Sequence, residues 1–247
     1  MGLISGFAVA GALMSCGAAP PLAIPVARSV TTPLATAAHP PKAAVELAVE
    51  VSPEPNDYAH RNYCVEGAIA ALLSTWTSAV PSLDAIGVSA HVSEAHGTRG
   101  ADATQALNAY LEQITGTARY SYSWTYVTSP AILKQQLEND LSGLGRFAPA
   151  GHGSPAIVHV WTATLPGWDG YQSSHAIAVF GYDFTAGNPN GDTVTYAESA
   201  GSVAGYNGPQ VQTISLAALW TATQTPWTAT QTPTTSTRPH SLWTLIG

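Results

Sequence analysis

Apolar residues change their spacing part-way along this chain, and the change limits the folds open to it. Between positions 64 and 141, apolar side chains recur at intervals of three and four residues, as on the buried faces of helices. From Pro155 onward, β-branched runs and alternating apolar residues replace that spacing. Helical segments followed by strands predict an α+β fold, with an N-terminal helical part packed on a C-terminal antiparallel sheet.

Three helices are expected in the first part. The first follows Cys64, and its apolar positions are Val65, Ala68, Ile69, Leu72, Leu73 and Trp76. The second covers about 102–114. The third begins after Ser129, which is suited to cap a helix whose first residue is Pro130, and Gly143 is suited to its end.

The strands are expected in the second part. A β-branched run begins at Pro155, and the alternating "HAIAVFGYDF" begins at His175. The turn-rich "TAGNPNGD" then predicts a hairpin into "DTVTYAES". A last strand in "PQVQTISLAALW" is expected to lead into a short helix capped by Ser215.

The first 16 residues have the features of an export signal. "LISGFAVAGALMSC" is apolar and rich in small residues, with the length of a signal-peptide hydrophobic region. Its end, LMSC, resembles a bacterial lipobox, whose cysteine is acylated after cleavage. The sequence therefore predicts a signal peptide or lipoprotein leader over 1–16 and a secreted or extracytoplasmic location. Cys16 is the candidate for lipidation, which would attach the protein to the cell-surface membrane.

Composition divides the remaining chain. Residues 17–51 are rich in alanine and proline and keep no helical or strand period, which predicts a linker. The ordered domain is expected over 52–223. Residues 224–247 form a Thr/Pro-rich tail in which "TATQTP" completes a repeat begun at Thr221, and we expect this tail to be extended or disordered, with no catalytic role.

Charge and motif content exclude several classes of function. The formal net charge of −7 does not favour a nucleic-acid partner, and no Gly-rich phosphate loop occurs. No CxxC pair is present, so a cysteine zinc site is not expected. Four histidines lack helical metal-ligand spacing: His91, His96, His152 and His159. We therefore expect no metal and no cofactor. We also expect the protein to be a monomer.

Cys64 is the residue on which the functional interpretation depends. The chain has two cysteines, so Cys64 is the only free thiol if Cys16 is removed or acylated. Exported proteins gain little from a free thiol, which favours a reactive role over apolar packing. A helix N-terminus and a neighbouring histidine both favour the thiolate, which is the nucleophilic form. Either role, nucleophile or buried small residue, fits the local pattern.

A histidine and an acid downstream could complete such a site. His175 begins a strand, where the backbone holds a side chain rigidly while the preceding loop leaves it open to solvent. A third group is needed to orient its ring. Glu198 ends the next strand of the hairpin and could lie beside it, although a solvated charge is an equal alternative. Asp183 lies eight positions past the histidine and is expected at the far end of that strand.

This order of motifs resembles the papain-like cysteine peptidases. "NYCVEGAIAALL" is similar to the helix start "CGPA" of the C39-like branch, which includes peptidases that cleave double-glycine leaders. "PAIVHV", "LPGW", "HAIAVFGYD" and "VTYAES" follow in the order of that branch's later segment. The resemblance covers about 56–219. It implies a papain-like fold in which Cys64 is the nucleophile, His175 the general base and acid, and Glu198 the orienting residue.

Two positions depart from the family pattern. Val65, Glu66 and Gly67 follow the cysteine, and the charge of Glu66 would oppose a thiolate. Tyr58 occupies the position of the family's oxyanion-hole glutamine. Two nearby amides, Asn56 and Asn62, are the candidates to donate instead, together with the cysteine's own backbone N–H.

Three aromatic residues cluster around the loop before His175 and could line a substrate groove: Trp161, Trp168 and Tyr171. Packing within the loop or core is an equal alternative for them. The leading hypothesis is an exported cysteine peptidase or amidase that acts on a peptide or protein substrate through an acyl-enzyme. The alternatives are a catalytically inactive binding module on the cell surface, and a transferase in which an amine replaces water.

Overall fold

The computed structural model describes residues 42–145, 149, 151–224 and 243–246, the last four by their backbone alone. The predicted leader over 1–16, Cys16, most of the predicted linker and most of the predicted tail lie outside the described residues. The compact unit that holds all described elements spans Pro40–Gly247.

The helices follow the sequence predictions closely, with one addition. They are α1 (Cys64–Leu73), α2 (Leu83–Ser89), α3 (Gly100–Thr115), α4 (Pro130–Leu141) and α5 (Leu216–Ala222), with short 3-10 turns at Thr162–Thr164 and Ser202–Ala204. The hydroxyls of Ser129 and Ser215 accept bonds from the backbone N–H groups of Ile132 and Ala218, so both predicted caps are confirmed. Helix α2 was not predicted.

The strands form one antiparallel sheet, which packs with the helices. The strands are β1 (Ala44–Glu46), β2 (Ser123–Tyr126), β3 (Ala156–Trp161), β4 (Ser174–Asp183), β5 (Thr193–Ala197), β6 (Val211–Ser215) and β7 (Trp243–Ile246). Their order is β2-β7-β3-β4-β5-β6, and β1 pairs with the end of β4. All pairs are antiparallel, so the predicted α+β class is confirmed at this level.

The sheet extends beyond the predicted domain of 52–223 at both ends. Strand β1 lies within the stretch expected to be a linker, and β7 lies within the stretch expected to be an extended tail. Both are short, and neither shows a local strand period over a useful length. Their partners are distant in sequence: β1 pairs with β4, and β7 pairs with β2 and β3. Such pairings depend on tertiary contacts that a local pattern does not reveal.

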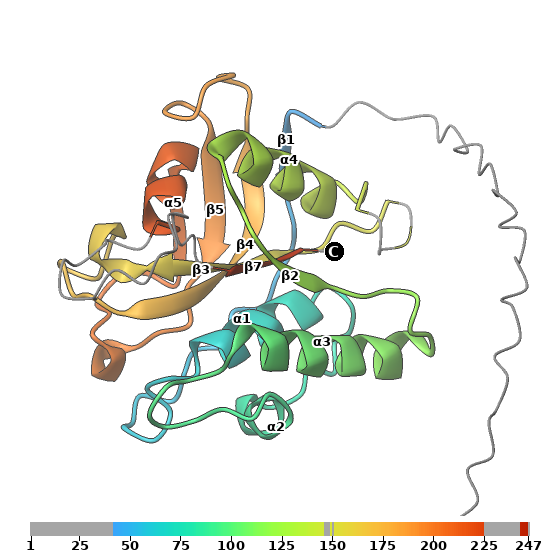
Figure 1. Ribbon diagram of the computed structural model, residues 1–247, viewed down its shortest axis with the longest axis vertical. Helices are drawn as coiled ribbons and strands as arrows, with labels where there is room; N and C mark the ends of the chain where they lie inside the picture. The colour runs from blue at the N-terminus through green and yellow to red at the C-terminus, as the bar shows by residue number, and fades with distance from the viewer. Residues whose placement is uncertain (1–41, 146–148, 150, 225–242, 247) are drawn as a thin grey trace, which may run out of the picture. The chain divides into compact units, whose positions relative to one another are not determined.

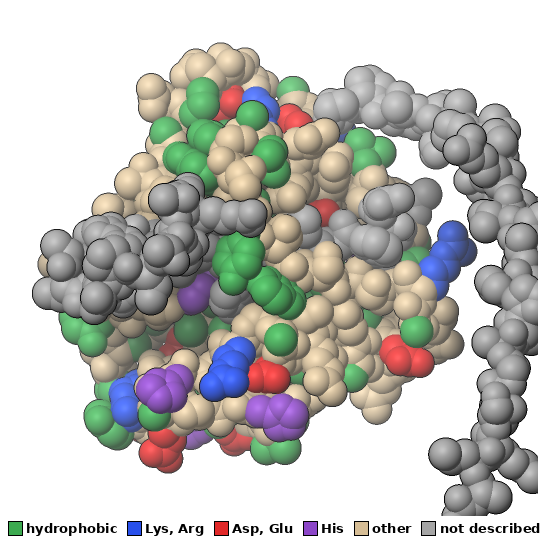
Figure 2. Space-filling model, in the orientation of Figure 1, with side chains coloured by type: hydrophobic (Ala, Val, Ile, Leu, Met, Phe, Trp, Pro, Cys, Tyr) green, Lys and Arg blue, Asp and Glu red, His purple; other side chains and the backbone are tan. Residues whose placement is uncertain are grey.

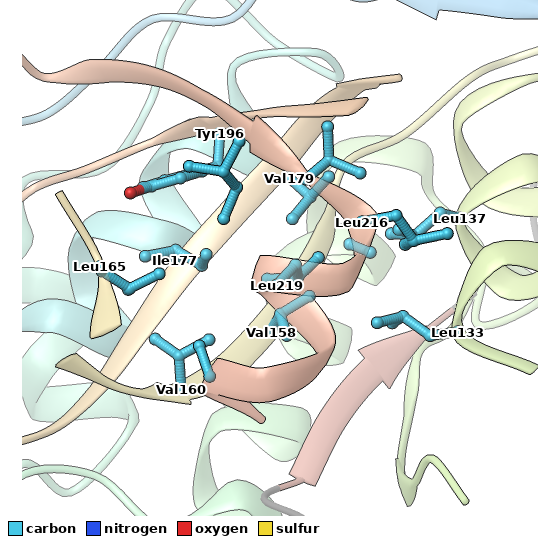
Figure 3. Packing of buried hydrophobic residues seen from close by; sticks show 14 of the residues in the cluster. Leu133, Leu137, Val158, Val160, Leu165, Ile177, Val179, Tyr196, Leu216 and Leu219 are labelled. Atoms are coloured by element: carbon cyan, nitrogen blue, oxygen red, sulfur yellow. The ribbon is translucent and has the colours of Figure 1, made fainter. Parts of the chain in front are cut away.

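Helices cover both faces of the sheet. Figure 1 shows α1, α2 and α3 on one side and α4 and α5 on the other. Strand β4 supplies both cores by alternation: Ile177 and Val179 join the core under α4 and α5, while Ala176 and Ala178 join the core under α1 and α3. Figure 3 shows the first of these cores, in which Leu133 and Leu137 of α4 approach Leu216 and Leu219 of α5.

Helix α1 is buried on all sides, where one apolar stripe had been expected. Every residue from 65 to 73 is buried. The helix packs on β4 and β3 and also contacts α2 and α3. Small residues make this close packing feasible, among them Gly67, Ala70 and Ala71. The central helix is therefore held rigidly, and so is its first residue, Cys64.

Charged and histidine side chains lie mostly along the lower part of the face in Figure 2, over the layer of α1, α2 and α3. Within the part of the chain that the structure describes, no helix is long and apolar enough to span a membrane.

Candidate active site

Cys64 is the first residue of α1, as the sequence predicted. The residue before it, Tyr63, makes no side-chain cap bond. The backbone N–H groups of the first turn and the positive end of the helix dipole are therefore available to an anion at this position. The cysteine is partly buried and unpaired, and it lines a pocket of about 350 Å³.

His175 and Glu198 meet beside this helix end. His175 is the second residue of β4, and Glu198 directly follows β5, the neighbouring strand. The imidazole Nε2 lies 2.6 Å from Glu198 Oε1. The Cys64 side chain also interacts with His175, and both residues line the same pocket. Because Glu198 occupies Nε2, Nδ1 is the nitrogen left for the thiol.

The charges around His175 favour its protonated form. Burial alone would lower the pKa of His175, which is only 3% exposed, but the Glu198 carboxylate and the interaction with Cys64 outweigh burial. The pKa of His175 consequently lies well above its ordinary value of 6.5. The ring is thus an imidazolium at neutral pH, and the expectation that it stands open to solvent was wrong.

Trp168 is what shields this ion pair. Its ring lies 4.9 Å from the His175 ring in an edge-on contact, and it is 1% exposed. Its Nε1 donates to Glu198 Oε2 at 3.3 Å, while the backbone N–H of Ala200 donates to Oε1 at 2.9 Å. Both carboxylate oxygens are therefore engaged, and water is excluded from a bond that grows stronger in a dry environment.

The pocket at this site has a polar wall. Thr98, Ser173, Ser174 and His159 line it together with the cysteine. His159 Nε2 lies 2.5 Å from Ser174 Oγ. Burial, and then the charge of His175, lower the pKa of His159 to about 4, so that ring is neutral beside the imidazolium.

The two candidate oxyanion donors are placed differently. Asn62 lines the pocket, and its Nδ2 donates to the Glu94 carbonyl at 2.5 Å. Asn56 does not line it. Its Nδ2 lies 3.1 Å from Ser202 Oγ, and its Oδ1 accepts from the backbone N–H of Val203 at 2.9 Å. Asn56 therefore caps the 3-10 turn at 202–204, and its predicted role as an oxyanion donor lacks structural support.

The aromatic candidates separate in the same way. Trp168 lines the pocket, but Trp161 and Tyr171 are not among its lining residues. Tyr171 is 55% exposed and stacks on Trp168 with the ring centres 6.3 Å apart. Tyr58, at the family's glutamine position, is 71% exposed and lies under the Arg61 guanidinium. Asp183 lies at the far end of β4, as expected.

Glu66 does not oppose the thiolate as strongly as its charge had suggested. The residue is fully buried, and Thr98 Oγ1 donates to its Oε1 at 2.6 Å. Burial raises the pKa of Glu66, while the Thr98 bond partly offsets the rise. The Glu66 carboxyl therefore ionises less readily beside Cys64 than a solvated glutamate would.

Sequence reasoning missed Glu54 entirely. In "SPEPND" it has the pattern of a solvated loop residue, yet it is 5% exposed and contacts Ser199. No local signal marks it, because its burial depends on the strand end that passes beside it.

Within residues 42–145 and 151–224, no three His, Cys, Asp or Glu side chains form a group that could hold a metal ion.

Comparisons with known proteins place few constraints on this chain. No protein-family model matches it. No curated protein matches it either. Among solved structures it is similar to digestive procathepsin L 3 from the larval midgut of Tenebrio molitor, with a TM-score of 0.41 and 15% identity. The match covers 72% of this chain and 66% of that chain. Such a similarity assigns no activity, so function is inferred from the site.

Proposed function

We propose that this protein is a papain-like cysteine hydrolase of the C39-like type that cleaves peptide or amide bonds. The observation that carries the proposal is the Cys64–His175–Glu198 arrangement at the N-terminus of a buried helix. Cys64 would be the nucleophile, His175 the acid and base, and Glu198 the residue that orients the ring. Trp168 excludes water from the pair.

The chemistry follows from these positions. The Cys64 thiolate attacks the substrate carbonyl carbon, and a carbon–sulfur bond forms. The His175 imidazolium gives its proton to the departing amine as the carbon–nitrogen bond breaks. A water molecule then attacks the acyl-enzyme while the neutral imidazole takes its proton; the carbon–sulfur bond breaks, and the acid product leaves with the thiolate and imidazolium restored.

An oxyanion must be stabilised during both attacks. The backbone N–H of Cys64 lies at a helix N-terminus and is one donor. Asn62 is the second, because an amide nitrogen carries two hydrogens and Glu94 engages only one of them.

Export, a lipid on Cys16 and a monomeric state belong to the same proposal. Incorporation of a labelled fatty acid that is lost in Cys16→Ala would test the lipid.

Thiol labelling tests the proposal without knowledge of the substrate. In the full chain carrying Cys16→Ala, Cys64 should react with iodoacetamide at pH 6 about tenfold or more faster than free cysteine, because the proposed mechanism requires a thiolate paired with the His175 imidazolium. Peptide mass spectrometry would locate the label. His175→Asn should bring the rate down to that of an ordinary thiol. A Cys64 rate no higher than that of free cysteine would reject an activated nucleophile.

Glu198→Gln is expected to lower peptide hydrolysis by about 10²-fold or more with little change in folding. The amide keeps the shape of the carboxyl but removes the charge that holds His175 protonated. Rates on a peptide library, read by mass spectrometry, provide the measurement. Trp168→Phe is the matched control, because it removes one bond to Glu198 and keeps the charge. Equal rates for Glu198→Gln and the unmodified protein would exclude the orienting role.

The second candidate is an inactive binding module on the same fold. It is favoured by the absence of a glutamine at Tyr58 and by the engagement of Asn62 with Glu94. Ligand binding that survives unchanged in Cys64→Ala, with no cleavage of any library peptide by the unmodified protein, would establish this candidate. An added amine that is joined to the product would identify a transferase.

A further inference from the structure

Glu54 fastens the chain before the cysteine helix to the strand end that carries Glu198. The backbone N–H of Glu54 donates to the carbonyl of Ser199 at 2.8 Å. In return, Ser199 Oγ donates to Glu54 Oε1 at 3.1 Å. Ser199 is the residue next to Glu198, so any shift of Glu54 is passed to the carboxylate that holds His175.

One oxygen of this buried carboxyl has no bond. Glu54 Oε2 has no hydrogen-bond partner among the described residues, although the residue is 5% exposed. A buried carboxylate with an unsatisfied oxygen is costly, and a protonated carboxyl is much less so. Burial at this site therefore keeps Glu54 neutral up to a higher pH than a solvated glutamate.

Three titratable groups act on Glu54 from the elements around it. They are His175 from β4, Glu198 after β5, and Glu66 from α1. The two glutamates disfavour a further negative charge, while His175 favours one. Burial is the largest influence and raises the pKa of Glu54 to about 7; His175 and the Ser199 bond oppose that rise, and the glutamates add to it.

We propose that Glu54 is a positioning residue whose ionisation, at the pH where the site works, helps to keep the His175 imidazolium charged. Attraction between two charges is mutual, so an anionic Glu54 must strengthen proton binding at His175 by as much as His175 favours the anion. In its neutral form Glu54 still ties Ser199 in place. The importance of Glu54 for catalysis rests on the proposed function, whereas the effect of Glu54 on the charge of His175 does not.

The free energy of unfolding should also depend on the ionisation of Glu54. The Glu54 carboxyl binds its proton more tightly in the folded chain than in the unfolded chain, where the pKa is near 4.5. The contribution of Glu54 is thus fully present below pH 4.5 and is lost as the pH rises towards about 7. Glu54→Gln copies the neutral carboxyl and should remove this loss.

The titration of His175 is the direct test. In the full chain with ¹⁵N-labelled histidine, His175→Asn would identify the His175 signals by their loss. Glu54→Gln should lower the pH at which His175 loses its proton by about half a unit. Iodoacetate labelling of Cys64 should then be about twofold slower at the original midpoint, since a half-unit fall in the pKa of His175 lowers its protonated fraction there from about one half to about one quarter.

Glu66→Gln is the matched control. Glu66 is also buried, but Thr98 donates to one of its carboxyl oxygens, and His175 does not contribute to the raised pKa of Glu66. The His175 titration should keep its midpoint in that variant. An unchanged midpoint in Glu54→Gln would overturn the proposal, and so would an equal shift in both variants.

A measurement on the unmodified chain covers the case in which Glu54→Gln does not fold. The His175 ¹⁵N shifts should show a small step near pH 7 while the ring remains protonated, because a neighbouring carboxyl ionises there. The absence of that step would overturn the proposal. If the His175 shifts behave as expected but Cys64 labels like free cysteine, the hydrolase fails and the role of Glu54 stands.

Discussion

Cys64→Ala is expected to reduce peptide hydrolysis to the uncatalysed background, a loss of about 10⁴-fold or more. The substitution removes the sulfur that is proposed to form the acyl-enzyme and leaves His175 without its nucleophile. The cysteine is partly buried and only slightly larger than alanine, so the fold should persist. Mass-spectrometric cleavage rates and a thermal unfolding curve provide the two readouts.

Cys64→Ser is the control for shape. A serine hydroxyl keeps the size of the side chain, but its much higher ordinary pKa prevents a stable ion pair with His175. It should therefore be nearly as inactive as alanine. An alanine variant that retains a tenth of the original rate would show that Cys64 is not the nucleophile and would favour a different centre.

Gly67→Ala is expected to destabilise the fold by about 1–3 kcal/mol, despite the higher helix propensity of alanine. A Cβ placed on Gly67 would overlap the Cβ and Oγ of Ser199. Helix α1 would have to retreat from the strand end that carries Glu198, and the separation between Cys64 and His175 would increase. Urea unfolding and the iodoacetamide rate of Cys64 should therefore change together.

Two further variants separate this overlap from a general effect of alanine. Gly87→Ala, in α2, would place its Cβ 3.0 Å from the end of the Tyr63 ring, which can yield, so a smaller loss is expected. Ser199→Gly combined with Gly67→Ala removes the overlapping atoms and should restore part of the lost stability. A fully stable Gly67→Ala with rapid Cys64 labelling would contradict the close packing described here.

The longer helices and central strands could be predicted because their causes are local. The α1 spacing, the Ser129 and Ser215 caps, and the alternation of β4 all lie within one element. Strands β1, β2 and β7 could not be predicted, because each is held by a partner far away in sequence. Helix α2 is seven residues long and too short for a clear periodic pattern.

The candidate site divides along the same line. Cys64, His175 and Glu198 could be singled out by residue type, by position at a helix start or strand end, and by order along the chain. Their contact at 2.6 Å between imidazole and carboxylate, and the cover provided by Trp168, depend on how the elements pack. Asn56 looked equivalent to Asn62 in sequence, yet only Asn62 lines the pocket.

By itself, then, the sequence determined which side chains are candidates for catalysis and which local elements present them, since periodicity, capping and residue type are properties of neighbours. Only the tertiary structure decided that His175 is buried beside the Glu198 carboxylate, that Glu66 is buried and bonded to Thr98, and that Glu54 lies against Ser199, the residue next to Glu198. The physical reason is that burial and charge coupling belong to groups close in space, and a residue's pattern along the chain does not record what will pack against it.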